Sequence, residues 1–361
     1  MTRSVPLTEE QQAVVDATRG PVRILAGAGT GKTTTITHRI AAQVENGDFD
    51  AQQIVAVTFT NAAANEMAHR LHELGIFGVR LGTIHSTAWR LVRACWNDWR
   101  GGAPPAILSR RLDLLVRCVP PGTLALDVVA DIEWLKRVRA TPATAGARLD
   151  GAARATHLDH AGTARVFGRY ERLKEERNLV DFEDQLELCI RMLAEHGPSN
   201  SWFRSTFRAF TVDEFQDIDP LQQALLREWV GDSEEICVVG DGLQAIYGFR
   251  GGSHEFLEDF ETWQPRAQTF HLTTNFRSTG EVLALANRFA ASLTGDHRPL
   301  RSRTSGPTPQ VSGMRDARQE MATLVDQIRR LHVEEDLPYE EMAIFYRIRA
   351  QSTGFETALS A

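Results

Sequence analysis

The stretch Leu25-Ala26-Gly27-Ala28-Gly29-Thr30-Gly31-Lys32-Thr33 decides the fold of this chain. Its three glycines permit the tight turns that aim successive backbone N–H groups at phosphate oxygens. Lys32 can reach the β- and γ-phosphates, and the Thr33 hydroxyl is placed to ligate Mg²⁺. Residues 22–25 before it predict a short buried strand, and residues 33–43 predict a helix whose positive end faces the phosphates. The stretch therefore indicates a nucleotide hydrolase, with a glycine-rich turn that binds no nucleotide as the alternative.

Length, composition and charge narrow the remaining possibilities. The chain has 361 residues and 42% hydrophobic content, which predicts about two to three globular domains. It has no apolar run long enough for a bilayer and no N-terminal secretory signal, so we expect a cytoplasmic protein without a membrane segment. Its four scattered cysteines indicate reduced thiols. The net charge of −7 argues against a generally positive surface but is compatible with a local nucleic-acid groove.

Strand-like and helical segments alternate along much of the chain. Predicted strands cover residues 22–25, 54–59, 79–83, 209–212, 235–239 and 269–272. This alternation predicts an α/β fold with a parallel sheet covered on both faces. Residues 86–196 contain helices and loops but no convincing strand, which predicts a helical insertion. Its tryptophans Trp89, Trp96 and Trp99 either stack on bases or pack a small helical domain.

The segments after residue 275 predict the start of a second α/β unit. Helices are expected at 280–289, 316–332 and 351–359, with a strand at 342–346 and a loop at 294–309. These pieces contain too few strands for a two-faced sheet.

The stretch Val212-Asp213-Glu214-Phe215-Gln216-Asp217 places two carboxylates after a buried strand. Asp213 can hold Mg²⁺, directly or through water, and Glu214 can orient or deprotonate an attacking water. The alternative is a helix N-terminus decorated with favourable acids. Hydrolysis also needs positive charge on the developing γ-phosphate, for which Arg277 is the candidate, with a surface arginine as the alternative.

Residues 238–252 interleave glycines, aromatic rings and a cation. Gln244 is an uncharged polar group suited to sensing a γ-phosphate. Tyr247, Phe249 and Arg250 suit stacking on single-stranded bases with a contact to the nucleic-acid backbone. Packing of aromatic side chains within a glycine-rich turn is an equal alternative.

These motifs, in this order over nearly all of the chain, resemble the N-terminal part of a superfamily 1 DNA helicase of the UvrD/Rep/PcrA type. Residues 7–11 resemble its Q motif, residues 58–64 and 82–86 its DNA-contacting motifs, residues 178–184 the segment that closes its helical insertion, and residues 343–352 its motif IVa. The resemblance implies that the nucleotide contacts Gln11, Ala26, Gly27, Ala28, Gly29, Thr30, Gly31, Lys32, Thr33, Thr34, Phe276 and Arg277. It implies DNA contacts from Phe59, Thr60, Asn61, Thr83, His85, Tyr247, Phe249 and Arg250.

The resemblance also implies roles and a domain organisation. Gln11 would read adenine, Phe276 would lie against adenine, and Arg277 would reach the γ-phosphate. Residues 1–90 with 197–274 would form a RecA-like ATP-binding domain (1A), 91–196 a helical insertion (1B), and 275–361 a partial second RecA-like domain (2A). Departures from the family pattern include Ala62, where lysine is usual, and Thr34, where arginine is frequent. The largest departure is the expected absence of motifs V and VI, which predicts a protein partner that supplies the missing C-terminal motor half.

The implied function is that of an ATP- and Mg²⁺-dependent DNA helicase or translocase. The family resemblance implies 3′-to-5′ movement on single-stranded DNA and action at single-/double-strand junctions, in repair, replication or recombination. From this chain alone we expect nucleotide binding, weak single-stranded DNA binding and slow hydrolysis without robust unwinding. Two alternatives remain: a regulatory or assembly subunit that binds ATP and DNA without motor activity, and a subunit of a nuclease-coupled recombination or defence complex.

Overall fold

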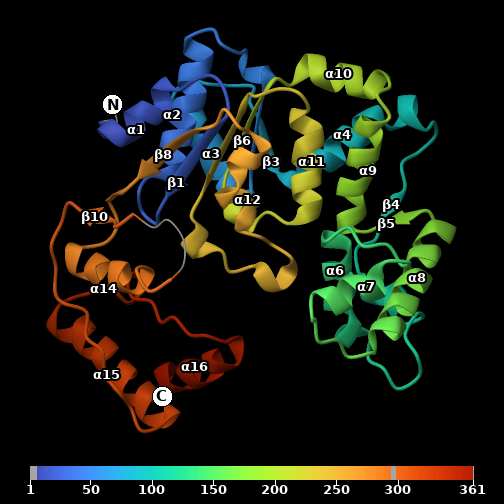
Figure 1. The fold of residues 1–361 in the computed structure, drawn as a ribbon. Helices are drawn as coiled ribbons and strands as arrows, with labels where there is room; N and C mark the ends of the chain where they lie inside the picture. Colours follow the sequence, from blue (N-terminus) through green and yellow to red (C-terminus); the bar gives the residue numbers. More distant parts are fainter. Residues whose placement is uncertain (1–5, 294–297, 361) are drawn as a thin grey trace. The chain divides into compact units, whose positions relative to one another are not determined.

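A parallel sheet of six strands carries the phosphate loop in the computed structural model, which describes residues 6–293 and 298–360. The strand order is β3-β2-β6-β7-β1-β8, and all neighbouring pairs run parallel (Figure 1). The strands are β1 (Val22–Ala26), β2 (Ile54–Thr58), β3 (Arg80–Thr83), β6 (Ala209–Val212), β7 (Ile236–Gly240) and β8 (Gln268–Leu272). Each predicted strand is present to within one residue at either end. The predicted α/β class with a parallel sheet is therefore confirmed.

Successive side chains of each strand point to opposite faces of the sheet. Both faces are buried, because helices cover each of them. Val55 and Val57 belong to one hydrophobic cluster, whereas Ile54 and Ala56 belong to the other. The helices that pack on the first cluster include α4 (Ile84–Trp99), α9 (Phe182–Ala194) and α11 (Pro220–Val230). Those that pack on the second are α1 (Glu9–Asp16), α2 (Lys32–Glu45) and α3 (Asn61–Glu73).

The chain between β3 and β6 is mostly helical and includes a core of its own. After α4 come α5 (Leu112–Leu115), α6 (Ala125–Arg137), α7 (Ala145–Gly151), α8 (His160–Glu176), α9 and α10 (Pro198–Thr206). Helices α5 to α8, which we call the helical segment together with their connecting loops, bury a separate cluster that includes Leu115, Ile132 and Tyr170. The three tryptophans belong instead to the sheet core: Trp89 is buried in it, and Trp96 and Trp99 pack against it.

The expectation that residues 86–196 contain no strand was wrong. A short parallel pair joins β4 (Ala106–Ile107) to β5 (Leu179–Val180). Each strand has only two residues, too few to produce a recognisable alternation in the sequence.

A cluster of buried charges joins the helical segment to α9. Lys136 Nζ lies 2.6 Å from Asp181 Oδ1, and Lys174 Nζ lies 3.2 Å from Asp181 Oδ2. The Tyr170 hydroxyl donates to the same carboxylate at 2.9 Å. Burial opposes ionisation of Asp181, but the surrounding cations Lys136, Lys174 and Arg111 hold its pKa well below the usual value. The cluster is an ionised network that ties three helices together.

Shorter elements complete the first of two compact units, residues 1–306. They are the 3₁₀ turns η1 (Ala51–Gln53), η2 (Phe215–Asp217), η3 (Gly242–Gln244) and η4 (Gly248–Arg250), the helices α12 (Glu255–Glu258), α13 (Phe260–Trp263) and α14 (Gly280–Ala290), and the parallel pair β9 (Thr274–Asn275) and β10 (Arg301–Ser302). The loop expected at 294–309 therefore contains β10, and its residues 294–297 lie outside the described part.

The second unit, residues 307–361, contains α15 (Ala317–Glu334), η5 (Tyr339–Glu341), η6 (Arg349–Gln351) and α16 (Ser352–Ser360). Its two predicted helices are confirmed. The predicted strand at 342–346 was wrong, because these residues pair with no strand in the described part of this unit. Phe345 within it is 95% exposed. An apolar run forms a strand only where a neighbouring strand accepts its hydrogen bonds.

Candidate nucleotide site and nucleic-acid groove

The phosphate loop connects β1 to α2 and needs its glycines for two reasons. Gly29 and Gly31 have φ angles of +71° and +82°, which side chains rarely adopt. A Cβ atom on Gly31 would also lie 2.6 Å from Gln11 Nε2, and one on Gly29 would lie 2.8 Å from the Cβ atom of Arg277. Neighbouring elements therefore press directly against the backbone of the loop.

Gln11 fastens helix α1 to this loop. Its Nε2 atom donates to the Thr30 carbonyl at 3.1 Å, and its Oε1 atom accepts from the Thr8 backbone N–H. The Thr8 hydroxyl in turn accepts from the Gln11 N–H, which completes a capping box. Both ends of the amide implied to read adenine thus contact protein groups.

The last residue of β9 and the residues that follow it lie against the phosphate loop. Asn275 Nδ2 donates to the Ala28 carbonyl at 2.6 Å, and the Phe276 N–H donates to the Gly29 carbonyl at 2.8 Å. Phe276 exposes 44% of its surface, and the Arg303 guanidinium lies 5.3 Å from its ring centroid. Arg277 is also exposed. The structure therefore brings Phe276 and Arg277 to the loop.

The carboxylates after β6 divide between two surroundings. Glu214 Oε2 lies 3.1 Å from Lys32 Nζ, so the acid reaches the phosphate loop. Asp213 is buried, and the Thr58 hydroxyl lies 3.4 Å from its Oδ2 atom. Burial and the adjacent Glu214 raise the pKa of Asp213 to about 6. Glu214 itself has a φ of +52°, a left-handed conformation that is uncommon for a residue with a side chain.

Gln216 links this acidic turn to the start of the next loop, a role that the sequence reasoning missed. Its Nε2 atom donates to Glu214 Oε2 at 2.9 Å, while its Oε1 atom accepts from the Asp241 N–H at 3.1 Å. Gln244 Nε2 donates to Asp241 Oδ2 at 2.7 Å. Beyond Lys32, the Thr34 hydroxyl accepts from Arg70 Nη1 at 2.7 Å, a further contact that spacing did not predict.

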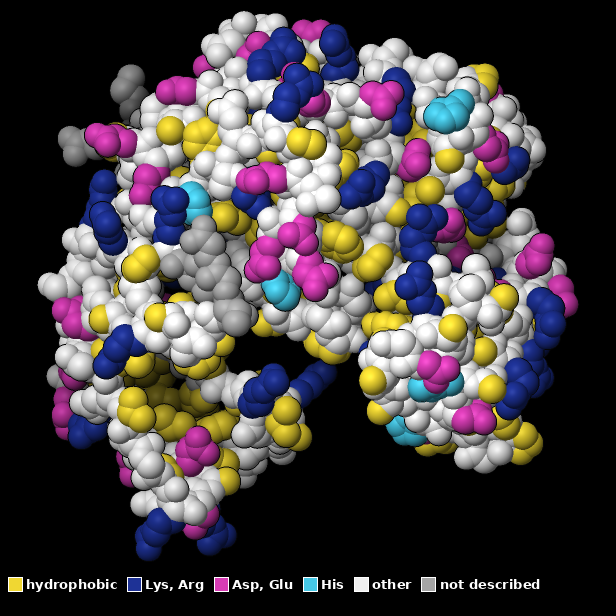
Figure 2. Space-filling view, viewed as in Figure 1, with side chains coloured by type: hydrophobic (Ala, Val, Ile, Leu, Met, Phe, Trp, Pro, Cys, Tyr) yellow, Lys and Arg dark blue, Asp and Glu magenta, His cyan; other side chains and the backbone are white. Residues whose placement is uncertain are grey.

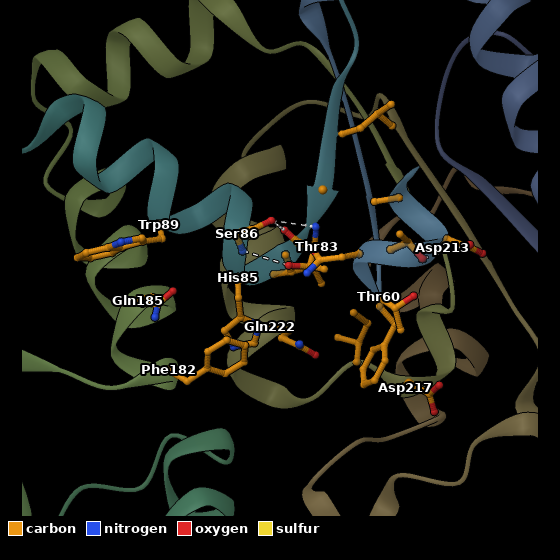
Figure 3. Close-up of a pocket in the computed structure, with 18 of the residues that line it drawn as sticks. Thr60, Thr83, His85, Ser86, Trp89, Phe182, Gln185, Asp213, Asp217 and Gln222 are labelled. Atoms are coloured by element: carbon orange, nitrogen blue, oxygen red, sulfur yellow. Dashed lines mark hydrogen bonds between the residues drawn. The ribbon is translucent and has the colours of Figure 1, made fainter. Parts of the chain in front are cut away.

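A groove of about 1100 Å³ lies beside the acidic turn, and Asp213 and Asp217 are part of its lining (Figure 3). Its lining includes seven of the eight residues predicted to contact DNA: Phe59, Thr60, Asn61, Thr83, His85, Tyr247 and Arg250. The eighth, Phe249, is exposed outside this lining, with its ring centroid 6.4 Å from that of Tyr247. Predicted DNA contacts from three separate parts of the chain therefore meet along one surface.

Stacked rings lie at two places in the groove. The ring centroids of Phe59 and Tyr247 are 5.2 Å apart at an interplanar angle of 20°. His85, at the start of α4, stacks on Phe182, at the start of α9, with centroids 3.7 Å apart (Figure 3). Phe182 is half exposed and was not among the predicted DNA contacts. The enclosing protein, and then Arg137, lower the pKa of His85 to about 3, so its ring is neutral.

Charges of both signs line the groove. Its cations are Arg80, Arg90, Arg137 and Arg250, and its acids are Asp213, Asp217 and Asp219. Figure 2 shows Lys and Arg side chains gathered where α6 approaches α9. Burial raises the pKa of Asp217 to about 6, with Glu214 adding to the effect, and burial raises that of Asp219 to about 7. Because these acids hold their protons more tightly than usual, they repel an anionic strand less than their number suggests.

Comparisons with known proteins match the N-terminal and C-terminal parts of the chain to two domains of UvrD-like helicases. Residues 7–264 match the UvrD/REP helicase N-terminal domain, and residues 270–361 match the UvrD-like helicase C-terminal domain. The expected absence of motifs V and VI is not borne out, since the C-terminal domain is matched as far as residue 361. In the described part of the chain, no helix is both long and apolar enough to cross a membrane.

The similar proteins are named as ATP-dependent DNA helicases. UvrD2 of Mycobacterium tuberculosis is 37% identical over 98% of this chain and 54% of its own length. UvrD1 of the same organism is 32% identical over 97% of this chain and 48% of its own length. PcrA of Staphylococcus aureus is 28% identical over 97% of this chain and 49% of its own length. The chain thus spans about half the length of the curated relatives it matches.

Proposed function

This chain belongs to the UvrD/REP family of helicases, and from that membership we propose that it couples ATP hydrolysis to movement along single-stranded DNA. The observation that carries the proposal is the 3.1 Å contact between Lys32 and Glu214. This contact joins the phosphate loop to Glu214. The preceding residue, Asp213, lines the groove that contains the stacked rings. ATP and DNA would therefore bind on either side of one short turn.

The nucleotide would bind along the loop 26–34. In this proposal Lys32 binds the β- and γ-phosphates, and Glu214 orients and deprotonates the attacking water. Arg277 and Gln244 contact the γ-phosphate, while Gln11 and Phe276 contact adenine. Gln11 must exchange its contact with Thr30 or Thr8 to do so.

Thr33 and Asp213 would hold Mg²⁺. A hydroxyl and a carboxylate are the hard oxygen donors that this ion prefers, and Asp213 already sits in a polar setting beside the Thr58 hydroxyl. When bound, the ion neutralises charge on the phosphate oxygens. The raised pKa of Asp213 fits such a site, because a buried carboxylate gains from a neighbouring cation.

DNA would lie in the groove with its bases against Phe59, Tyr247 and Phe249. The stacked, partly exposed rings support single-stranded rather than duplex DNA, because only unpaired bases offer their faces. Movement from 3′ to 5′, action at single-/double-strand junctions, and a role in repair, replication or recombination complete the proposal. The separate core of α5 to α8 supports a 1B-like insertion at residues 91–196 between the halves of a 1A-like domain, with 275–361 as the 2A-like part.

The test is ATP turnover by this chain with and without single-stranded DNA. We expect turnover that rises when DNA is added and disappears in Lys32→Ala. Nucleotide and DNA binding without stimulated turnover would favour a regulatory subunit instead. Unwinding of duplexes with a 3′ or a 5′ tail then tests direction, and faster unwinding of the 5′-tailed duplex would contradict the proposed polarity.

A further inference from the structure

The aromatic loop, residues 247–252, is fastened to the helical segment through its own backbone. Arg154 Nη1 donates to the Phe249 carbonyl at 3.2 Å, and Arg137 Nη1 donates to the Arg250 carbonyl at 3.4 Å. Arg137 is the last residue of α6, and Arg154 follows α7. Two cations from the helical segment therefore bind two successive carbonyls of one loop.

Both arginines are held in place by other contacts. Arg154 Nε lies 3.3 Å from Asp131 Oδ1 on α6, and its guanidinium lies 5.2 Å from the Trp134 ring centroid. Arg137 Nε lies 3.4 Å from Glu183 Oε1 on α9. Because these contacts fix the guanidinium planes, binding the loop costs little further side-chain entropy.

The loop backbone also approaches α6 closely. Gly251 has a φ of +97°, and a Cβ atom on it would lie 3.5 Å from Arg137 Cβ and 3.7 Å from Trp134 Cδ1. The space beside the helix is therefore sufficient for a side chain, but the backbone conformation strongly favours glycine. The left-handed conformation of Gly251 therefore helps to hold the loop backbone close to α6.

The carbonyl groups of the loop contact the helical segment, whereas its side chains contact one another and Phe59. Tyr247 stacks on Phe59 in the groove, and the Arg250 guanidinium lies 5.6 Å and 5.4 Å from the ring centroids of Tyr247 and Phe249. We propose that Arg154, together with Arg137, is a positioning residue that holds the aromatic loop so that its rings are presented to DNA. This inference rests on the proposed function, since it requires DNA in the groove.

The competing explanation is that these arginines bind DNA phosphates themselves. Arg137 lines the groove, whereas Arg154 is not part of its lining, so Arg154 separates the two explanations better. A cation that contacts a phosphate contributes to the salt dependence of binding, by about 0.7 in the slope of log K against log salt for a single strand. A cation that contacts only a carbonyl of the loop leaves this slope unchanged.

The experiment compares Arg154→Met with the parent chain and with a matched control, Arg165→Met. Arg165 is an exposed arginine of α8 that forms a 4.0 Å ion pair with Asp159. Affinity for a fluorescein-labelled oligo(dT) is measured by anisotropy at several salt concentrations, and affinity for a fluorescent ATP analogue is measured in parallel. A 2-aminopurine base in the oligonucleotide reports stacking.

We expect Arg154→Met to weaken DNA binding about tenfold, as loss of stacking on about one base would. Its salt slope and its ATP affinity should equal those of the parent, 2-aminopurine quenching should fall, and Arg165→Met should match the parent throughout. DNA affinity equal to that of the parent, or a slope smaller by about 0.7, would overturn the inference.

A second variant guards against misfolding of the first. Gly251→Ala strains the loop without removing any cation, and we expect the same loss of DNA affinity and quenching with normal ATP binding. Parent-like DNA binding in Gly251→Ala would contradict the inference even if Arg154→Met failed to fold. A parent chain that does not bind the oligonucleotide would overturn the proposed function, and this inference with it. Normal binding by the parent and by both variants would overturn the inference alone.

Discussion

Lys32 and Glu214 form an ion pair of 3.1 Å across 182 positions of sequence. Glu214 reaches this position from a left-handed backbone conformation, which costs on the order of 1–3 kcal/mol for a residue with a side chain. Lys32 and the Gln216 amide both contact its Oε2 atom and so offset that cost. The side chain with the strained backbone is the one proposed to orient the attacking water.

Glu214→Gln should separate nucleotide binding from turnover. The amide keeps the shape of the side chain but cannot accept a proton, so we expect ATP turnover to fall at least about 100-fold. ATP affinity should stay within about threefold of the parent value. Glu73→Gln, on the exposed surface of α3, is the control. Unchanged turnover in Glu214→Gln would mean that Glu214 is not the base.

Lys32→Ala should weaken nucleotide binding. A hydrogen bond to a charged group contributes about 1.5–3 kcal/mol, so we expect ATP affinity to fall at least about tenfold. Titration with a fluorescent ATP analogue measures this effect. DNA affinity without nucleotide should change little, and a variant that binds ATP normally would remove Lys32 from the proposed site.

Phe59→Ala and Tyr247→Ala should each weaken binding of single-stranded DNA by about 1–3 kcal/mol. Because the two rings stack on each other, their effects should not add, and the double variant should lose less than the sum. Fluorescence anisotropy on the four proteins of the cycle measures the coupling. Phe289→Ala, an exposed ring on α14, is the control. Strict additivity would indicate that the rings hold separate bases.

His85 should make stability fall at acidic pH. Its pKa is lowered to about 3 by burial and Arg137, whereas the ordinary value is 6.5. The unfolded chain therefore takes up a proton that the folded chain does not, and the stabilisation is complete above pH 6.5 and is lost as pH falls towards 3. Between pH 7 and 5, His85→Gln should lose about 1–2 kcal/mol less unfolding free energy than the parent. Urea unfolding at several pH values measures this, and equal losses would contradict the shift.

Lys136→Met should destabilise the junction between the helical segment and α9. It leaves Asp181 buried with fewer cations, and breaking such a pair costs about 3–5 kcal/mol. The double variant Lys136→Met/Asp181→Asn should recover part of the loss, because the buried charge is removed as well. Urea unfolding of both variants measures the difference. A double variant less stable than the single one would show that Asp181 is held by its other partners.

Most of the sheet was predictable because its central strands are apolar runs bounded by turn residues, as at Ile54–Thr58. The run at 342–346 has the same appearance, yet Phe345 is almost fully exposed and the segment is not a strand. The difference lies in partners rather than in composition, and a single sequence does not show which strands are available to pair. The two-residue strands β4 and β5 were missed for the opposite reason, since they depend on their pairing alone.

The phosphate loop and the acidic turn could be located from sequence because their residues are consecutive. The contacts that join them to the rest of the site involve residues far apart in the chain, such as Gln216 with Asp241 and Arg154 with Phe249. Gln11 shows that one side chain can make both a local contact, which sequence spacing predicts, and a distant contact, which it does not. Its spacing from Thr8 predicts a capping box, which the structure contains, but the same amide also contacts Thr30.

The fastening of the aromatic loop by carbonyl groups has an evolutionary consequence. Every amino acid supplies the same carbonyl, so positions 249 and 250 can exchange side chains without losing the bonds from Arg154 and Arg137. Natural variation or directed evolution can therefore alter which bases the loop prefers while its attachment is inherited unchanged. Gly251, in contrast, is constrained by its left-handed backbone conformation, so substitutions that change base preference are expected at 249 and 250 rather than at 251.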